Sequence, residues 1–259
     1  MNYIKTRRDD NVCNICGKTV SQLSWDHVPP KGGLDLSAVE IRNYTNSFDP
    51  KSKDRRESQN GLKFRTICKP CNEMLGTSYD KCFNALMNDV KDKLINSPDN
   101  QQVINIETKP TKIIKSILGH LLATKTKDCN LIIDRITKEY LFKENAILTN
   151  DIHVYCWIYP FDCTIIRNDV VSLDPMDPRT VYYSVIKSFP LGFAVSHECE
   201  LTYGFTDITG YNYNDDYKVC KIPLYLNRQY NWDYPENLRY SGVQLIAKHT
   251  NDIFVTRKK

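Results

Sequence analysis

The sequence predicts a mixed α+β fold with a metal-stabilised N-terminal unit, and three observations carry this prediction. Two CxxC pairs lie 51 residues apart in the first third of the chain. After the second pair, apolar residues recur every three or four positions, which is typical of an amphipathic helix. From residue 151 onward, β-branched and aromatic segments alternate with Asn, Asp, Pro or Gly, which indicates antiparallel strands.

The N-terminal unit, residues 1–97, is expected to contain a strand, a long polar loop, a second strand and a helix. The first strand covers 23–28 and ends at Pro29-Pro30. The loop runs to about residue 60, with at most one short helix at 36–41. The second strand covers 61–67. Pro70 then suits the first turn of a helix because it has no amide hydrogen to satisfy there. The apolar stripe of this helix is Leu75, Tyr79, Cys82, Leu86, Val90 and Leu94.

A linker rich in Asn, Gln and Asp at 96–102 separates this unit from a second α+β domain, residues 98–259. Helices are expected at 113–122 and 130–142. Strands are expected at 153–159, 163–166, 181–186, 193–196, 218–226 and 243–247. We expect an antiparallel sheet with two helices on one side, and a role in target selection, sensing or self-association.

The four paired cysteines, Cys13, Cys16, Cys68 and Cys71, match the ligand set of a structural zinc ion, which prefers four tetrahedral ligands. A closed site of this kind leaves no coordination position for a substrate. The first residues, MNYIKTRRDDN, lack the apolar segment of a secretory signal, so we expect the protein in the cytoplasm with reduced thiols and without a membrane span. The other six cysteines are interpreted as small buried hydrophobes. They are Cys82, Cys129, Cys156, Cys163, Cys199 and Cys220.

Positive charge gathers in the N-terminal unit. Residues 1–97 carry 16 Lys and Arg against 12 Asp and Glu, whereas residues 98–259 carry 19 of each. The excess concentrates between residues 51 and 69. A basic stretch beside a metal site suits a polyanion such as nucleic acid, although such a run on its own is as compatible with a solvated surface.

Three motifs in order resemble those of the HNH (ββα-metal, His-Me finger) endonucleases that carry a zinc ion. The motifs are Cys13-Asn14-Ile15-Cys16-Gly17, Trp25-Asp26-His27-Val28-Pro29-Pro30-Lys31 and Cys68-Lys69-Pro70-Cys71-Asn72. The resemblance spans about 90 residues. It implies that His27 is the general base and that Asp26 and Asn72 hold a catalytic Mg²⁺ or Mn²⁺ ion. DNA is the implied substrate, with RNA second.

The residue types suit these roles. Carboxylate and amide oxygens are ligands that magnesium prefers, and a histidine with a pKa of about 6.5 is largely neutral at cellular pH and accepts a proton. Adjacent residues of a regular strand point to opposite faces, so Asp26 and His27 need a bulge or sharp twist, imposed by the two prolines, to share a site. Asn60 either orients His27 or is a loop residue.

Three cationic residues, Lys31, Lys63 and Arg65, are candidate phosphate contacts, with Arg65 facing the cleft. Asp80 lies eight positions after Asn72. It is interpreted as a solvated helix acid, with a supporting role near the site as the alternative. The remaining histidines, His120 among them, are interpreted as packing residues.

The leading functional hypothesis is a metal-dependent HNH endonuclease, of the kind used as an effector in bacterial anti-phage or restriction systems. The alternative is a non-enzymatic zinc-finger module that binds nucleic acid or a protein. A redox role for the CxxC pairs is disfavoured because both bracket one ββα unit. The oligomeric state and any regulatory partner stay open.

Overall fold

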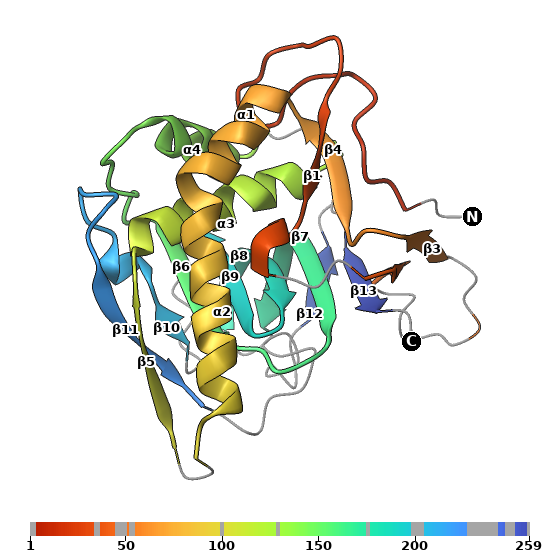
Figure 1. Ribbon diagram of the computed structural model, residues 1–259. Helices are drawn as coiled ribbons and strands as arrows, with labels where there is room; N and C mark the ends of the chain where they lie inside the picture. The colour runs from red at the N-terminus through yellow and green to blue at the C-terminus, as the bar shows by residue number, and fades with distance from the viewer. Residues whose placement is uncertain are drawn as a thin grey trace.

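The computed structural model describes residues 4–33, 37–44, 51, 55–98, 101–127, 130–174, 177–197, 205–226, 243–246 and 252–257. It is a mixed α+β structure with mostly antiparallel strands (Figure 1). A long helix lies in front of a large sheet, and a second helix crosses between them. This arrangement confirms the predicted fold class.

The predicted strand, strand and helix of the N-terminal unit are present. Strand β1 (Ser24–His27) pairs antiparallel with β4 (Lys63–Ile67). Helix α1 (Lys69–Met74) follows, with Pro70 in its first turn, and continues through the π-helical η3 (Leu75–Asp80) into α2 (Lys81–Ile95). Within the expected stripe, Leu75, Tyr79, Leu86 and Val90 are buried, which confirms the amphipathic prediction.

The polar loop between β1 and β4 differs from its prediction. In place of the short helix expected at 36–41, the chain forms a 3-10 turn η1 (Lys31–Gly33), then strands β2 (Val39–Asn43) and β3 (Arg55–Ser58). Strand β2 pairs with the C-terminal strand β13 (Ile253–Arg257). The alternating residues Val39 and Ile41 are buried, which is the pattern of a half-buried strand. The segment therefore forms a strand although the residues around it have the composition of a loop.

The large sheet has the order β10-β6-β9-β8-β7-β13-β2-β3, and β12 also pairs with β7. Its remaining strands are β6 (Ile152–Ile158), β7 (Cys163–Asp174), β8 (Asp177–Ser188), β9 (Leu191–His197), β10 (Thr206–Asp207) and β12 (Val243–Ile246). A separate pair joins β5 (Val103–Thr108) to β11 (Cys220–Tyr225), and 3-10 turn η4 (Thr209–Tyr211) follows β10. All six strand regions expected after residue 150 are confirmed, whereas β5, β10 and β13 were not anticipated.

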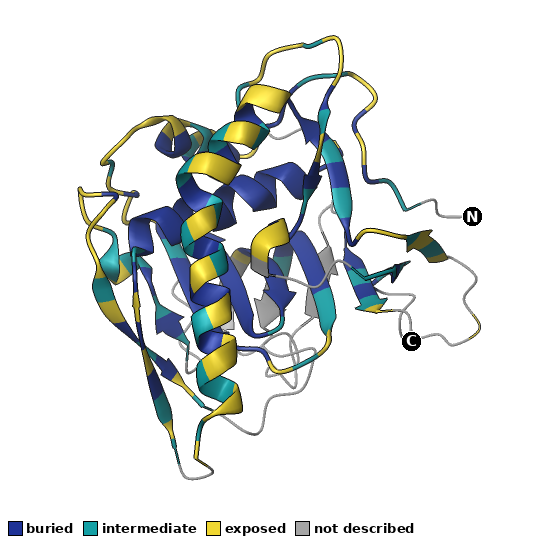
Figure 2. Ribbon diagram, in the orientation of Figure 1, coloured by how far each residue is buried: buried dark blue, intermediate teal, exposed yellow. Residues whose placement is uncertain are grey.

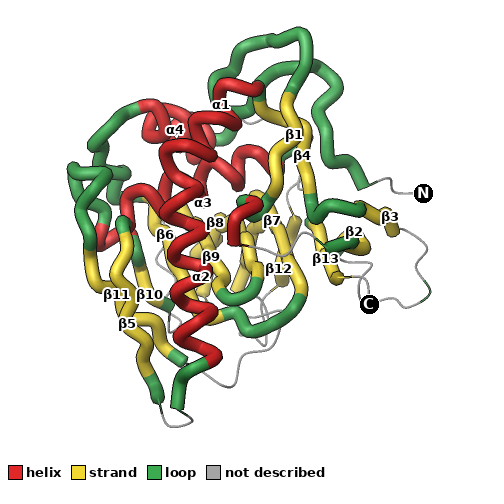
Figure 3. Tube along the Cα trace, in the orientation of Figure 1, coloured by secondary structure: helices red, strands yellow, loops and turns green. Residues whose placement is uncertain are grey.

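Strands from both sides of the expected domain boundary share this sheet. Figure 3 shows β2 and β3 beside β13, near the lower end of β4. One hydrophobic core likewise includes Ile15 and Phe64 from the N-terminal unit and Val154 and Phe193 from the sheet. The two parts of the chain therefore pack as one body around a common core.

Helix α3 (Pro110–Thr124) lies at the centre of that core, and α4 (Ile132–Phe142) packs beside it. All residues of α3 are buried, and Figure 2 shows the helix dark blue along its length, in contrast to the exposed outer face of α2. A helix buried all round normally carries only apolar side chains, but α3 includes Lys115, Ser116 and His120. Their partners define much of the site described next.

Candidate functional site

The four cysteines of the two CxxC pairs converge on one point. The first pair sits in a turn closed by Gly17, whose amide donates to the Cys13 carbonyl at 2.9 Å, and the second pair begins helix α1. The four Sγ atoms all lie within 4.8 Å of one another. Four sulfur donors at this spacing form a donor set that suits a metal such as zinc.

The protonation of these thiols also favours a cation. The neighbouring Cys71 thiol lowers the pKa of Cys13, and the same proximity raises the pKa of Cys71. The backbone amide of Cys68 donates to Cys13 Sγ at 3.2 Å. Metals bind cysteine as the thiolate, so a bound cation would replace the thiol protons.

His27 ends strand β1 in the state that a general base requires. The backbone of Asn60 favours the protonated ring, but its effect is smaller than that of burial. The ring nitrogen Nε2 is buried and has no hydrogen-bond partner among the described residues. Burial lowers the pKa of His27, and the charge of Lys63 lowers it further, against the opposing effect of Asp26. The imidazole is therefore neutral near pH 7.

A small cavity of about 50 Å³ lies beside His27. Strands β7 and β8 contribute Thr164 and Ser188, and β13 contributes Arg257. This volume has room for a few water molecules. The cavity thus joins His27 to residues more than 130 positions away in the sequence.

Asp26 faces the other way, into a buried chain of polar groups. Its Oδ2 atom lies 3.0 Å from Nδ1 of His120, and Nε2 of His120 lies 2.9 Å from Oδ1 of Asp80. Ser116, one turn before His120 on α3, donates to the same Asp80 oxygen at 2.8 Å. Burial opposes a charge on His120, but the two carboxylates outweigh it and raise its pKa to about 10. The imidazole is therefore a cation between two anions.

The expected bulge at Asp26 and His27 is absent from the described β1–β4 ribbon. These residues pair regularly with Phe64 and Lys63, and the register irregularity falls between Ser24 and Trp25. Asp26 and His27 consequently project from opposite faces of the ribbon. The prediction that the two prolines would bring both side chains to one side is wrong, because regular ladder pairing extends through both residues.

Asn72 fastens helix α1 to strand β1. Its Nδ2 atom donates to the Trp25 carbonyl at 2.9 Å and to Ser24 Oγ at 3.0 Å. A carbonyl acceptor requires the nitrogen on that side, so the amide oxygen points away from the strand. The Asn72 carboxamide therefore lies beside Trp25, the neighbour of Asp26 in the chain. Its oxygen takes part in neither of these two hydrogen bonds.

The basic residues lie close to His27 in the ribbon. Lys63 is directly opposite His27, and Arg65 is opposite Trp25, so these four side chains share one face. Arg65 is half-buried, with Nε donating to the Leu23 carbonyl at 3.0 Å, and Lys31 is exposed on η1. Trp25 is 46% exposed on this face, although the strand pattern gave no indication of it.

Two interpretations made from sequence need correction. His120 is no simple packing residue, and Asp80 is no solvated helix acid, because its side chain is 13% exposed and contacts both His120 and Ser116. Only the position of Asp80, eight residues after Asn72, indicated from sequence that Asp80 could lie near the site. Of the six unpaired cysteines, Cys156 is buried, whereas Cys82, Cys163 and Cys220 are only partly so; Cys129 and Cys199 lie outside the described residues.

The chain matches no protein-family model, no curated protein and no solved structure. The likeness to HNH endonucleases therefore rests on the residues themselves. Within the residues that the structure describes, none of the helices is both long enough and apolar enough to cross a membrane.

Proposed function

We propose that this protein is a metal-dependent endonuclease of the HNH type that hydrolyses phosphodiester bonds, with DNA as the preferred substrate. One observation carries the proposal: the His27 imidazole is neutral near pH 7, and its buried Nε2 atom has no partner among the described residues. A buried nitrogen without a hydrogen bond lowers the stability of the fold. A role in binding water or substrate explains why such an atom is kept.

In this proposal His27 takes a proton from an attacking water molecule. The unpartnered Nε2 atom supports this role because no described residue occupies the position from which a water molecule would donate its proton. The effect of Asn60 on His27 comes from its backbone, so its side chain should be replaceable. Lys63 and Arg65, on the same face of the ribbon, would bind phosphate, and the exposed Trp25 would stack on a base.

Two oxygen atoms are candidates for holding a Mg²⁺ or Mn²⁺ ion. Oδ1 of Asp26 and the amide oxygen of Asn72 take no part in the hydrogen bonds found among the described residues, and both are the hard donors that these cations prefer. A bound divalent ion would stabilise the negative charge that develops on the leaving oxygen. The four cysteines would hold a separate zinc ion, whose role is to stabilise the fold.

A second candidate is a non-enzymatic module that binds nucleic acid through the same ribbon. The observation in its favour is that Asp26 and His27 leave β1 on opposite faces, because a pure binding surface does not need the two side chains to act on one phosphate. The two hypotheses differ in a single measurable property, because only the first requires turnover.

The experiment is cleavage of plasmid DNA by the purified, zinc-loaded chain in the presence of Mg²⁺ or Mn²⁺. We expect His27→Ala to abolish cleavage while zinc content and thermal stability stay unchanged. His153→Ala is the matched control because His153 is distant from the ribbon and pairs with Asp207. Single-stranded DNA and RNA are assayed in parallel to establish the substrate.

Undiminished cleavage by His27→Ala would exclude this histidine as the base. DNA binding without cleavage by the wild type under any metal condition would favour the binding module. Cleavage that appears only after a partner or small molecule is added would support a regulated effector of the anti-phage or restriction kind.

A further inference from the structure

We propose that His120 is a positioning residue, which holds the Asp26 carboxylate in the orientation needed to bind the divalent cation. Asp80 serves as the second anchor of the imidazole. This inference rests on the proposed function, since it assigns a partner to the aspartate of the Asp-His motif. It adds a residue from a helix outside the ββα unit.

The hydrogen-bond geometry leaves one carboxylate oxygen of Asp26 for a cation. Oδ2 is held by Nδ1 of His120 at 3.0 Å, so rotation of the carboxylate would break that bond. Oδ1 is the oxygen that remains. Partners of this kind orient metal ligands and are as important to many metal centres as the ligands themselves.

The imidazole itself has little freedom to move. His120 is 1% exposed and belongs to a helix that is buried on every side. Its other nitrogen bonds to Asp80, which Ser116 holds in turn. Three elements, β1, η3 and α3, therefore meet at one ring, and each contributes a fixed group.

The cluster is more polar than packing requires. A histidine between two carboxylates occupies a place where three apolar side chains would stabilise the fold at least as well. The Asp26 oxygen that His120 leaves free is a hard donor of the kind that a divalent cation prefers.

Two amide variants separate the two bonds. The amide nitrogen of Asn falls near the place of Nδ1, so His120→Asn can still donate to Asp26. The amide nitrogen of Gln falls near the place of Nε2, so His120→Gln can donate to Asp80 instead. Both variants remove the positive charge equally, so the loss of charge cancels in the comparison.

The measurement is Mn²⁺ binding to the zinc-loaded full-length protein by calorimetry, with Asp26→Asn as the reference for loss of the site. We expect His120→Gln to weaken binding by about 10–100-fold, and His120→Asn by less than about tenfold. His153→Gln is the control. It replaces a histidine that pairs with Asp207 and has no bond to Asp26, Asp80 or His120, and it should leave Mn²⁺ affinity unchanged.

Equal Mn²⁺ affinity in the Asn and Gln variants, or weaker binding by the Asn variant, would overturn the positioning role. If neither variant folds, the wild type supplies the answer through the NMR signal of the His120 Nδ1 proton. Added Mg²⁺ should shift this signal in the wild type and leave Asp26→Asn unaffected, and a signal that ignores Mg²⁺ overturns the proposal. A wild type that fails to cleave nucleic acid would defeat the proposed nuclease, while a difference between the amide variants would still establish the positioning role.

Discussion

Gly119 allows α3 to lie against η3 closely enough for the neighbouring His120 to reach Asp80. A Cβ atom at this position would lie 2.4 Å from Cδ2 of Leu75, a fully buried side chain with no free space to move into. We expect Gly119→Ala to lower the free energy of unfolding by about 1–3 kcal/mol, because overpacking forces side chains or backbone to shift. Chemical denaturation with tryptophan fluorescence measures this change.

Gly76 offers a matched control on the neighbouring element. Nothing lies within 4 Å of a Cβ atom at this exposed helical position. Gly76→Ala should therefore leave stability unchanged or raise it by about 0.5–1 kcal/mol, since alanine restricts the unfolded chain. Equal effects of the two substitutions would contradict the close approach of the two helices.

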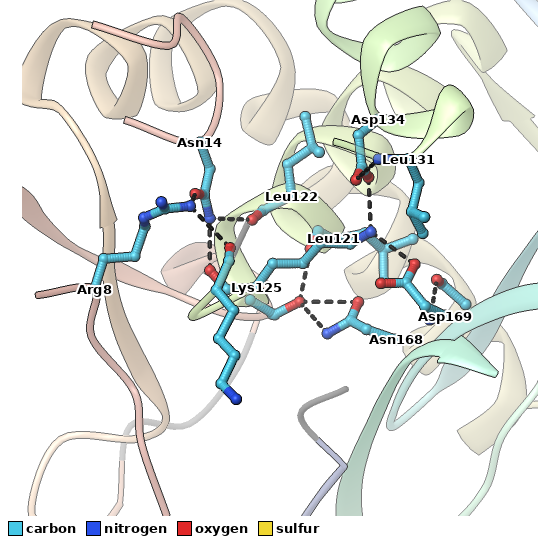
Figure 4. Close-up of polar contacts among 12 residues, drawn as sticks. Arg8, Asn14, Leu121, Leu122, Lys125, Leu131, Asp134, Asn168 and Asp169 are labelled. Carbon is cyan, nitrogen blue, oxygen red and sulfur yellow. Dashed lines mark hydrogen bonds and ion pairs between the residues drawn. The ribbon is translucent and has the colours of Figure 1, made fainter. Parts of the chain in front are cut away.

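The turn of the first CxxC pair is tied directly to the end of α3. Figure 4 shows Asn14 pointing at the last carbonyls of that helix, where its amide nitrogen donates to Leu122 at 2.8 Å and to Lys125 at 2.6 Å. Arg8 donates to the oxygen of the same side chain at 2.8 Å. The Asn14 side chain thus acts as a cap supplied from a distant segment, because it donates to carbonyls at the end of the helix.

Removal of this cap should destabilise the protein measurably. We expect Asn14→Ala to reduce the free energy of unfolding by about 1–3 kcal/mol, because two buried carbonyls and the Arg8 guanidinium each lose a hydrogen bond. Asn96→Ala is the comparison, since Asn96 makes one exposed bond to the Asp92 carbonyl and its loss should cost far less. Similar melting temperatures for the two variants would show that the Asn14 bonds contribute nothing beyond an exposed cap.

At the scale of whole elements, the long helix was predictable but its π-helical turn was not. The apolar stripe and Pro70 indicate a helix through residue 94, whereas η3 widens it where it meets α3. Such turns commonly mark functional sites. This one ends at Asp80, whose contact with His120 depends on a helix 40 residues away in the sequence.

The shared core makes metal binding a property of the entire molecule. Residues beside the cysteine cluster, such as Ile15 and Ile67, belong to the same hydrophobic core as strands of the large sheet. Removal of the metal by a chelator should therefore lower the melting temperature in a single transition for the full chain, because metal binding contributes folding free energy. Calorimetry before and after chelation measures this. Two separate transitions would instead mean that the N-terminal unit unfolds alone.

Cysteine variants test the same linkage without a chelator. Cys68→Ser should lose zinc and stability together, whereas Cys82→Ser should keep one zinc ion per chain, because Cys82 lies outside the cluster. Zinc is quantified by elemental analysis of the purified variants. A stable, metal-free Cys68→Ser protein would contradict a structural role for the site.

The sequence by itself determined the elements whose signals are local. The strands and helices that confirm their predictions follow from periodicity over a few residues, and the cysteine set and the Asp-His pair follow from short motifs. Tertiary structure decided which side chains meet: Asp26 with His120, Asn14 with the end of α3, and β2 with β13. These contacts join segments about 100 to 200 residues apart, and their free energy comes from burial in a common core, which no local pattern of residues records.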